Sequence, residues 1–512
     1  MSRVALIALG LSFGLAACND PNNPQTWIKR LRDPEYATQA IKELQRIGDP
    51  AAVPPLCELY KDFESPTILK AIISFKDKRA IPTLIAALEF TEDKYHNATL
   101  AAATLAEMKA TEAVEPLTKV LDKAISIRSR ANLAKLAAIE ALAQLGDKRA
   151  VGALIKTLER RPEQQDFLLN KKAAEALGEL GDPQAVPVLI RALFTSSTLQ
   201  GTSFPMARVA LVRIGQPAVK PLLEAMQGKD RALEGMAKEL KFADGVVLNK
   251  TAIVLGDLGA KDAVPALLEQ LGKASPTETK VAGVIEGLGK IGDERAVEPL
   301  VKLLLNGKVD YKIRQQAAQA LTVLGSKKAI APLLEVAEKG YVEGGYSNLR
   351  EACAMAYSRI VGKEAGQGVA KIKAMIADDK IKGDPRVVGT FKEALERVQV
   401  ALECQDDAAC YGKKVTDEKL SLAQREKAGI MIGILPDGRK ALADLVKALP
   451  VREPILRLFF LQSAMRIGNG KDTQLIAMLE ELAAKDSKRP VKFLGADLAT
   501  HDKMAVALIK KK

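Results

Sequence analysis

The sequence has few of the residues that build aromatic cores or histidine-based sites. Aromatic residues make up 4% of the 512 residues, Trp occurs once, His twice and Cys five times. Ala, Leu, Lys and Glu dominate instead, which favours helices packed through small and aliphatic side chains. The length alone would suggest about three or four domains, unless the chain repeats. The composition therefore predicts an all-α protein.

The charge is strongly positive but not concentrated. The formal net charge is +13, and the basic residues are spread along the chain. A basic surface favours acidic partners such as anionic lipid, acidic glycans, nucleic acid or an acidic protein. A generally soluble, lysine-rich helical surface accounts for the same charge, and the absence of basic blocks does not favour nucleic acid.

Long hydrophobic runs are also missing, apart from one at the start of the chain. Residues 4–15 form an apolar stretch of twelve residues after Arg3. A membrane-spanning helix needs about 20 residues, so the stretch fits the core of a signal peptide better than a span.

The residues that follow this stretch, Leu15, Ala16, Ala17 and Cys18, resemble the lipobox of bacterial lipoproteins. The resemblance implies cleavage before Cys18 and attachment of diacylglycerol and a further acyl chain such as palmitate to this residue. Two or three acyl chains suffice for stable anchoring. An ordinary secretory signal with a coincidental cysteine is the alternative.

The resemblance also implies a location in the bacterial cell envelope. In lipoprotein sorting, Asp directly after the cysteine retains the protein in the inner membrane. Asn19 takes that place here and Asp20 follows, which favours the outer membrane. We therefore expect a signal peptide over residues 1–17 and a tether over residues 18–26.

One pattern returns along most of the remaining chain, most clearly in ALGELGDPQAVPVLIRAL, residues 176–193. Its glycine recurs at positions 146, 181, 215, 259, 292 and 325, so the usual step is 33 to 35 residues. Such a period is typical of a stacked solenoid. An Ala-rich helix is predicted to end at the glycine. The following Asp or polar residue is predicted to cap a second helix, which an early proline shortens and bends.

These residues resemble the HEAT-like repeats of the phycobilisome-lyase type, down to the LGD…AVPPL core. The resemblance implies a right-handed α-solenoid of about a dozen helix pairs, with regular repeats over residues 27–360 and degenerate ones over residues 361–512. Residues 194–206, 227–249 and 340–348 depart from the repeat. Such insertions are expected either to meet partners or to be tolerated decoration.

The sequence motifs give little support for an enzymatic function. GLGKIG, residues 287–292, fits the dinucleotide-binding pattern GxGxxG, but it lies where every other repeat has its Ala-rich helix. The di-iron deoxyhypusine hydroxylases use similar repeats with several His-Glu pairs, and this chain has no His-Glu dipeptide. His96 and His501 are expected on the surface. No catalytic residue, metal site or cofactor is predicted.

The cysteines after Cys18 fall into two groups. Cys57 and Cys353 lie in helical stretches and are expected to be small core residues. Cys404 and Cys410 enclose a polar segment between two helical stretches. In an oxidising compartment this spacing suits a disulfide, and a metal site with Asp406 or Asp407 is the alternative.

The inner surface of a HEAT solenoid is the expected binding surface. Lys135, Arg314 and Arg350 stand at equivalent positions of three Ala-rich helices, seven residues before the aligned Leu142, Leu321 and Tyr357. They are partner-binding candidates for an acidic protein, whereas inter-repeat ion pairs or plain solvation are the alternatives.

The sequence thus favours a lipid-anchored, non-catalytic scaffold for an unidentified protein partner, acting as a monomer or in a hetero-complex. A lyase or a metal-dependent oxidoreductase of the HEAT-like group is the alternative.

Overall fold

The computed structural model describes residues 20–512 except 274–278, 340–347, 379–380, 489–491 and 494–495. It divides into two compact units. Unit 1 comprises the residues up to 188 and residues 195–203, and unit 2 comprises residues 189–194 and 204–512. The lipobox residues Leu15 to Cys18 and most of the predicted insertion at 340–348 lie outside the described residues.

Unit 1 is a stack of helix pairs with one small hairpin. Trp27 is buried, and its Nε1 donates to Pro21 O at 2.8 Å. Among the described residues, the first helix begins at Pro24, inside the predicted tether. The helices are α2 (Pro24–Ile28), α3 (Ala37–Ile47), α4 (Val53–Phe63), α5 (Pro66–Ser74), α6 (Ile81–Ala86), α7 (Tyr95–Glu107), α8 (Val114–Asp122), α9 (Asn132–Leu145), α10 (Val151–Glu159) and α11 (Phe167–Leu180). The predicted insertion at 194–206 contains the antiparallel pair β1 (Ser196–Ser197) and β2 (Gly201–Thr202), with Ser196 opposite Thr202.

Unit 2 continues the same pattern, after α12 (Val186–Ala192), which contains residues of both units. Its helices up to α22 are α13 (Phe204–Ile214), α14 (Val219–Met226), α15 (Arg231–Glu239), α16 (Val246–Asp257), α17 (Val264–Lys273), α18 (Ala282–Ile291), α19 (Val297–Leu305), α20 (Tyr311–Leu324), α21 (Ile330–Lys339) and α22 (Asn348–Ile360). The remaining elements are α23 (Gly366–Ala377), α24 (Pro385–Cys404), α25 (Ala408–Thr416), α26 (Leu422–Ile434), α27 (Leu442–Ala448), α28 (Pro454–Ile467), α29 (Thr473–Lys488), β3 (Lys492–Phe493), β4 (Ala496–Asp497) and α30 (Leu498–Lys510). The predicted extra stretch at 227–249 contains α15.

The turn between the two helices of a pair follows the sequence pattern. Gly146, at the end of α9, has φ 70°, and Gly181, at the end of α11, has φ 64°, a conformation that glycine adopts without strain. Asp182 then accepts from Gln184 N at 2.9 Å and begins a short 3₁₀ turn rather than the helix itself. The prolines, such as Pro54 in α4, lie in the first helical turn, where no backbone donor is needed. The expectation that they bend the helix is therefore wrong.

Each pair is held by small and aliphatic side chains, as the composition predicts. The aligned leucines Leu44, Leu142, Leu177 and Leu321 are fully buried, and the alanines around them pack helix against helix. The all-α solenoid expected from the sequence is thus confirmed. Among the described residues, none of the helices combines the length and hydrophobicity that crossing a bilayer would require.

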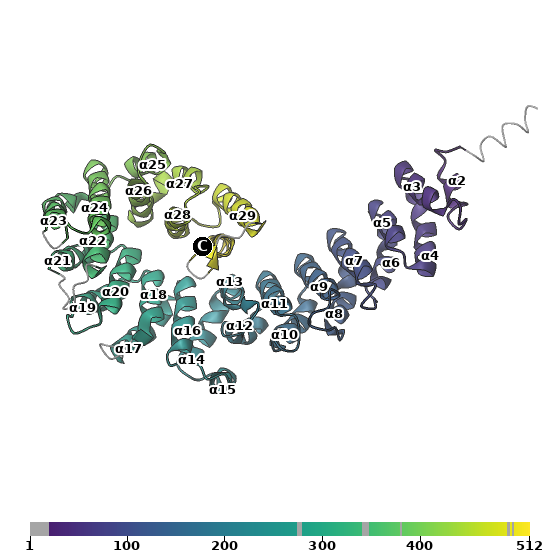
Figure 1. Cartoon of the computed structure of the whole chain (residues 1–512), viewed down its shortest axis with the longest axis horizontal. Helices are drawn as coiled ribbons and strands as arrows, with labels where there is room; N and C mark the ends of the chain where they lie inside the picture. Colours follow the sequence, from purple (N-terminus) through teal and green to yellow (C-terminus); the bar gives the residue numbers. More distant parts are fainter. Residues whose placement is uncertain (1–19, 274–278, 340–347, 379–380, 489–491, 494–495) are drawn as a thin grey trace, which may run out of the picture. The chain divides into compact units, whose positions relative to one another are not determined.

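In unit 2 the first helices of successive pairs form a row that closes on itself. Each of α13, α16, α18, α20, α22, α24, α26 and α28 packs against the next, α30 follows α28, and α30 also packs against α13 (Figure 1). Val209 and Val212 of α13 form a buried cluster with Met504 and Ala507 of α30. Lys511 adds a hydrogen bond from its Nζ to Val212 O at 2.7 Å.

The GLGKIG segment belongs to this row. It lies at the end of α18, which packs closely on α16 and α20. A Cβ at Gly287 would stand 2.4 Å from Ala252 O, and one at Gly289 would stand 2.9 Å from Ala320 Cα. The segment is a helix and not a strand-turn-helix, so its glycines serve close packing, as the repeat alignment predicts.

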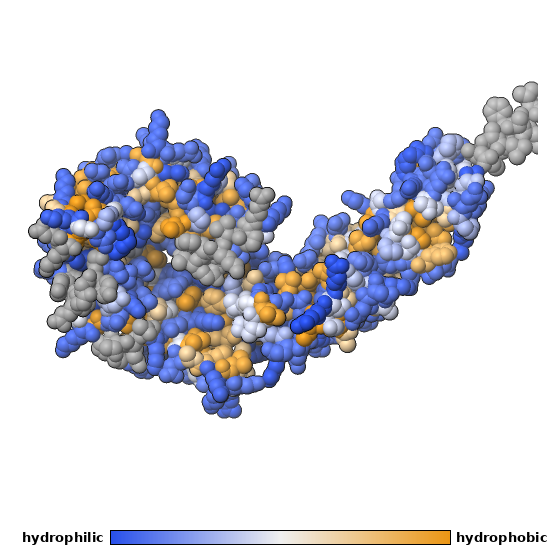
Figure 2. All heavy atoms as spheres, viewed as in Figure 1, coloured by the Kyte–Doolittle hydropathy of each residue, from blue (hydrophilic) through white to orange (hydrophobic). Residues whose placement is uncertain are grey.

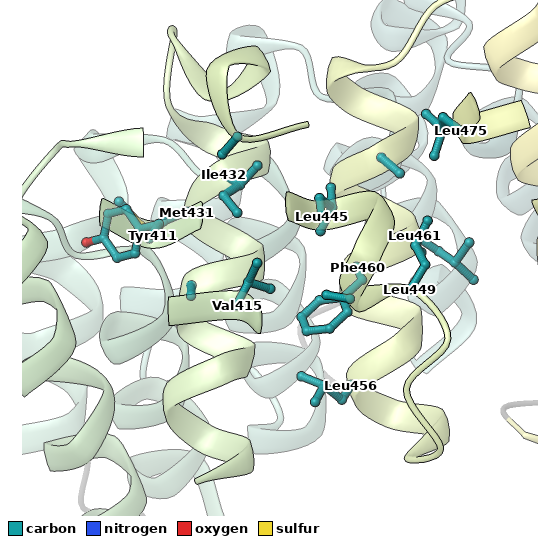
Figure 3. Close-up of a cluster of buried hydrophobic side chains, with 14 of the residues drawn as sticks. Tyr411, Val415, Met431, Ile432, Leu445, Leu449, Leu456, Phe460, Leu461 and Leu475 are labelled. Atoms are coloured by element: carbon teal, nitrogen blue, oxygen red, sulfur yellow. The ribbon is translucent and has the colours of Figure 1, made fainter. Parts of the chain in front are cut away.

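The degenerate repeats of the C-terminal part have a continuous core of their own. Figure 3 shows Phe460 and Leu456 of α28 pointing toward Val415 of α25, with Leu445 of α27 beside them. Phe460, Val415 and Leu445 have no exposed surface. The stack therefore continues to α30 although the sequence pattern fades.

Candidate functional site

A groove lies in unit 1 between α4 and α6, the second helices of two successive pairs. It has a volume of about 450 Å³, within the range of ligand-binding clefts. Pro54 of α4 and Pro82 and Ala86 of α6 line its sides. Figure 2 shows hydrophobic side chains gathered around α4 among hydrophilic ones.

One residue that lines the groove is shorter than its counterparts in other repeats. Ala86 stands five residues after the first residue of α6 and is exposed. Long polar side chains hold the same place in other second helices: Lys119, Lys156, Arg191, Glu224, Glu269 and Lys302. The groove thus has an alanine at a position that is long and polar elsewhere.

The floor of the groove carries buried polar groups. Cys57, Tyr60, Thr83 and Asn97 line it and are between 4% and 6% exposed. Burial raises the pKa of the Cys57 thiol, and the adjacent Thr83 side chain opposes that rise. Burial also raises the pKa of Tyr60, a rise that Glu64 adds to and Asn97 opposes. Both groups therefore stay neutral over the physiological pH range.

Asn97 is the most informative of these groups. Its Nδ2 donates to Glu64 O at 2.7 Å, whereas its Oδ1 is buried without a hydrogen-bond partner. A buried acceptor without a donor costs about 1–3 kcal/mol, which a ligand N–H could recover.

The rim of the groove is charged but balanced. Lys61 pairs with Glu58 at 2.7 Å, and Lys94 pairs with Glu64 at 2.6 Å. These pairs are exposed, and exposed pairs contribute about 0–1 kcal/mol. They can therefore exchange partners with a charged ligand at little cost.

The basic residues predicted to bind a partner are placed differently. Lys135 is 4% and Arg314 is 7% exposed, and Arg350 is half-buried. Arg314 Nε donates to Leu304 O at 2.8 Å, and Arg350 Nε donates to Ala337 O at 2.9 Å. Each of these two arginines satisfies a terminal carbonyl of the preceding second helix.

Asn170, which interrupts the basic row in the sequence, has the same role, since its Nδ2 donates to Leu158 O and Arg160 O at 3.1 and 2.7 Å. Burial lowers the pKa of Lys135 to about 8, and nearby Arg160 adds to the decrease. Arg314, Arg350 and Asn170 thus cap the second helix of the preceding pair, and binding of a partner by Lys135, Arg314 and Arg350 stays a prediction.

Unit 2 contains buried ion clusters that the sequence did not reveal. Asp257 of α16 accepts from Arg208 Nη2 at 2.7 Å and lies 3.1 Å from Lys290 Nζ. Burial alone would raise the pKa of Asp257, but Arg208 and Lys290 outweigh it and lower the pKa. Glu426 of α26 likewise forms ion pairs with Arg359 and Arg397.

Two further buried charges lie between helices of unit 2. Lys427 has no exposed surface and donates to Arg359 O at 2.9 Å and to Val361 O, so burial lowers its pKa well below the usual value. Asp502 of α30 pairs with Arg457 of α28, which also contacts Asp486 at 2.6 Å. Burial and the carboxylates of Asp486 and Asp497 raise the pKa of Asp502 to about 7 against the effect of Arg457.

A second structural pattern was missed although the sequence contains it. Arg79, Arg149 and Arg295 each stand two residues after a capping Asp. Their Nη2 groups donate to carbonyls of the preceding repeat, namely Pro50 O, Thr111 O and Lys261 O, at 2.8, 3.0 and 3.0 Å. The D-x-R triplet at the turn between the two helices of a pair, which follows a glycine at Asp147 and Asp293 and Lys76 at Asp77, is the signal that identifies these inter-repeat contacts.

The remaining residues singled out by sequence lie apart from the groove, except Cys57. Cys404 and Cys410 are joined by a disulfide that links α24 to α25. Asp406 pairs with Lys327 at 2.8 Å, and Asp407 caps α25. His96 is exposed and His501 is half-buried. Within the described ranges, no three His, Cys, Asp or Glu side chains are grouped as metal ligands.

Comparison with known families identifies the repeats. A HEAT-repeat profile matches residues 124–198, 233–321 and 282–356, and the profile of the PBS lyase HEAT-like repeat matches residues 30–62. No curated protein matches the chain by sequence.

Solved structures show the same fold. Kap121p bound to Nup53p has 12% sequence identity and a TM-score of 0.51 over 96% of this chain and 60% of Kap121p. A Kap121p mutant has 12% identity and a TM-score of 0.50 over 99% of this chain and 62% of that one. This chain therefore spans about three-fifths of the Kap121p chains.

Two enzymes are similar over shorter segments. Human deoxyhypusine hydroxylase has 21% identity and a TM-score of 0.21, covering 54% of this chain and 94% of that one. The CpcE–CpcF complex of phycocyanin lyase from Nostoc has 19% identity and a TM-score of 0.22, covering 62% and 94%. From the family models and its fold, the chain is an α-solenoid that contains HEAT repeats, with a PBS lyase HEAT-like repeat at residues 30–62.

Proposed function

We propose that this chain is a lipid-anchored scaffold of the bacterial cell envelope that binds an extended segment of a protein partner, without catalysing a reaction. The groove between α4 and α6 carries the proposal, because it combines a volume of about 450 Å³ with a buried acceptor that lacks a donor. The similarity in fold to Kap121p, whose structures contain bound Nup53p or Pho4p, supports a role in binding proteins.

The chemistry of the groove suits an extended peptide. Pro54, Pro82 and Ala86 offer an apolar slot for a small side chain. A backbone N–H of the peptide would supply the donor that Asn97 Oδ1 lacks. The balanced rim pairs accept a charge of either sign, so shape and the buried hydrogen bond decide which segment binds.

Site-specific crosslinking in intact cells tests the groove. A photoreactive amino acid at Pro82 is expected to give one defined protein adduct. Ala86→Trp fills the groove and should abolish the adduct. Lys156→Trp, at the equivalent exposed position of α10 and away from the groove lining, should leave it unchanged. An adduct that survives Ala86→Trp would contradict this docking site.

The anchor is a separate part of the proposal and rests on the lipobox residues Leu15 to Cys18. Cys18→Ser should stop incorporation of labelled palmitate and should allow a high-salt wash to release the protein from membranes, since salt screens the remaining electrostatic contacts. A Cys18→Ser protein that is still acylated would refute the anchor.

Catalysis by a metal centre is the competing function. Metal analysis of purified protein distinguishes the two, because stoichiometric iron or zinc would contradict a non-catalytic scaffold.

A further inference from the structure

Three neighbouring segments of unit 1 form one edge, which we call the basic edge: residues 123–131 before α9, residues 160–166 before α11, and the hairpin residues 195–203. Arg160 of the second segment reaches the end of α8, directly before the first segment, because its Nη1 donates to Leu121 O at 2.9 Å. Gln200 links the last two, because its Nε2 donates to Asp166 Oδ1 at 2.8 Å and its Oε1 accepts from Phe167 N at 2.9 Å. The segments are therefore contiguous.

The basic edge exposes leucine and isoleucine side chains where a solenoid has no packing use for them. Leu133 and Leu168 are the second residues of α9 and α11 and are 46% and 38% exposed. Ile127 is 41% exposed in its loop, and Leu199, between the two hairpin strands, is 89% exposed. Figure 2 shows hydrophobic surface over α9 and α11. Single exposed leucines are common, but four on adjacent segments mark a contact surface.

The charge of the first segment of this edge has one sign. Residues 123–131 contain three basic residues and no acidic one. Arg128 and Arg130 are exposed, and neither forms an ion pair within the part of the chain that the structure describes. The loop of residues 89–94, with Glu89 and Glu92, bounds the positive region on one side through contacts to Lys123 and Ser129.

We propose that the basic edge binds the surface of an anionic phospholipid bilayer. Exposed aliphatic side chains next to unpaired arginines are the combination that inserts into the headgroup boundary while neutralising lipid charge. The hairpin tip around Leu199 contains no charged residue, so insertion of Leu199 into the bilayer would not require a neighbouring charge to lose its water. The inference builds on the proposed lipid anchor, which brings the chain to a membrane, but its test does not need the anchor.

The test uses the Cys18→Ser chain, which carries no acyl group, and measures cosedimentation with vesicles. Vesicles of equal parts phosphatidylglycerol and phosphatidylcholine should bind it at low salt at least tenfold more tightly than vesicles of phosphatidylcholine alone. Leu168→Ser with Leu199→Ser should weaken binding to the anionic vesicles at least tenfold. Arg128→Glu with Arg130→Glu should abolish the preference for them.

Matched controls lie elsewhere in unit 1. Phe63→Ser removes an exposed aromatic residue at the end of α4, and Lys156→Glu reverses an exposed charge on α10, and neither should change binding. Equal binding to both kinds of vesicle, or unchanged binding by the edge variants, would overturn the inference. A loss of protein crosslinks but not of vesicle binding in Leu199→Ser would assign the edge to a protein instead. If the basic edge does not bind anionic vesicles but Cys18 is acylated in cells, the membrane-binding inference is refuted and the proposed lipid anchor is not.

Discussion

The close packing of α16 and α18 makes a quantitative prediction about Gly287. In Gly287→Ala the new Cβ would stand 2.4 Å from Ala252 O and 3.0 Å from Ala252 C. Carbon–oxygen contacts between packed helices are usually ~3.3–3.6 Å, so the contact is short by about 1 Å. The obstacle is backbone and cannot rotate away, which means that the two helices must separate.

The expected cost follows from two opposing effects. Overpacking of this kind costs about 1–3 kcal/mol, and a backbone obstacle belongs at the upper end. Alanine recovers about 1 kcal/mol over glycine inside a helix. We therefore expect Gly287→Ala to destabilise α16 and α18 by about 2 kcal/mol, which corresponds to roughly 30-fold faster amide exchange where exchange reports local opening.

Hydrogen exchange followed by mass spectrometry is the suitable assay, because a long repeat array does not unfold in a single two-state step. Gly152→Ala in α10 is the matched control, since nothing lies within 4 Å of its added Cβ. It should slow exchange by a factor equivalent to about 0.5 kcal/mol. Exchange in α16 and α18 that is unchanged or slower in Gly287→Ala would refute the reasoning.

Three further predictions concern unit 2. Glu426→Ala leaves two buried arginines without their carboxylate and should destabilise α24 and α26 by about 3–5 kcal/mol in hydrogen exchange, whereas a cost below 1 kcal/mol would show that the cluster is solvated. Asp502 has a pKa of about 7 in the fold against 3.8 ordinarily, so its stabilising effect is complete below pH 4 and is lost as the pH rises through 7. Corrected for intrinsic rates, exchange of α30 should therefore be faster at pH 8 than at pH 5, and Asp502→Asn should remove the difference; a difference that persists contradicts this origin. Cys404→Ser with Cys410→Ser opens a closed loop of about seven residues and should cost about 2 kcal/mol in hydrogen exchange of α24 and α25, with free thiols in the native protein as the contrary result.

Most of the fold is predictable from the sequence because its determinants are local. The glycine after each Ala-rich helix adopts the left-handed conformation, and the next polar residue accepts from a backbone amide two residues on, as at Gly181 and Asp182. Both effects need only neighbouring residues, so a repeat of 33 to 35 residues indicates them. The role of the early prolines was misjudged because a shift of one or two residues in the helix start decides whether a proline is harmless.

The groove was only partly visible in the sequence. Its short lining residue, alanine at position 86 in place of a long polar side chain, can be found by aligning the repeats. Its depth depends on side chains from α4, α6 and the start of α7, including Asn97, whose burial no pattern reports. Three basic residues at one repeat position were likewise expected from the sequence to be exposed. In the fold Lys135 and Arg314 are buried and Arg350 is half-buried.

The all-α class, the helix-pair repeat, its caps and the lipobox resemblance can be derived from the amino-acid sequence alone, since each depends on residues close together in the chain. The packing of α30 against α13, the buried carboxylates such as Asp257 and Glu426 that join several helices, and the groove beside Ala86 become visible only in the folded chain. These contacts join residues up to about 300 positions apart, as Lys511 and Val212 do. Each helix pair is rotated slightly relative to the one before it, and these rotations add up along the stack until distant helices meet. The sequence of a single repeat does not show this total rotation.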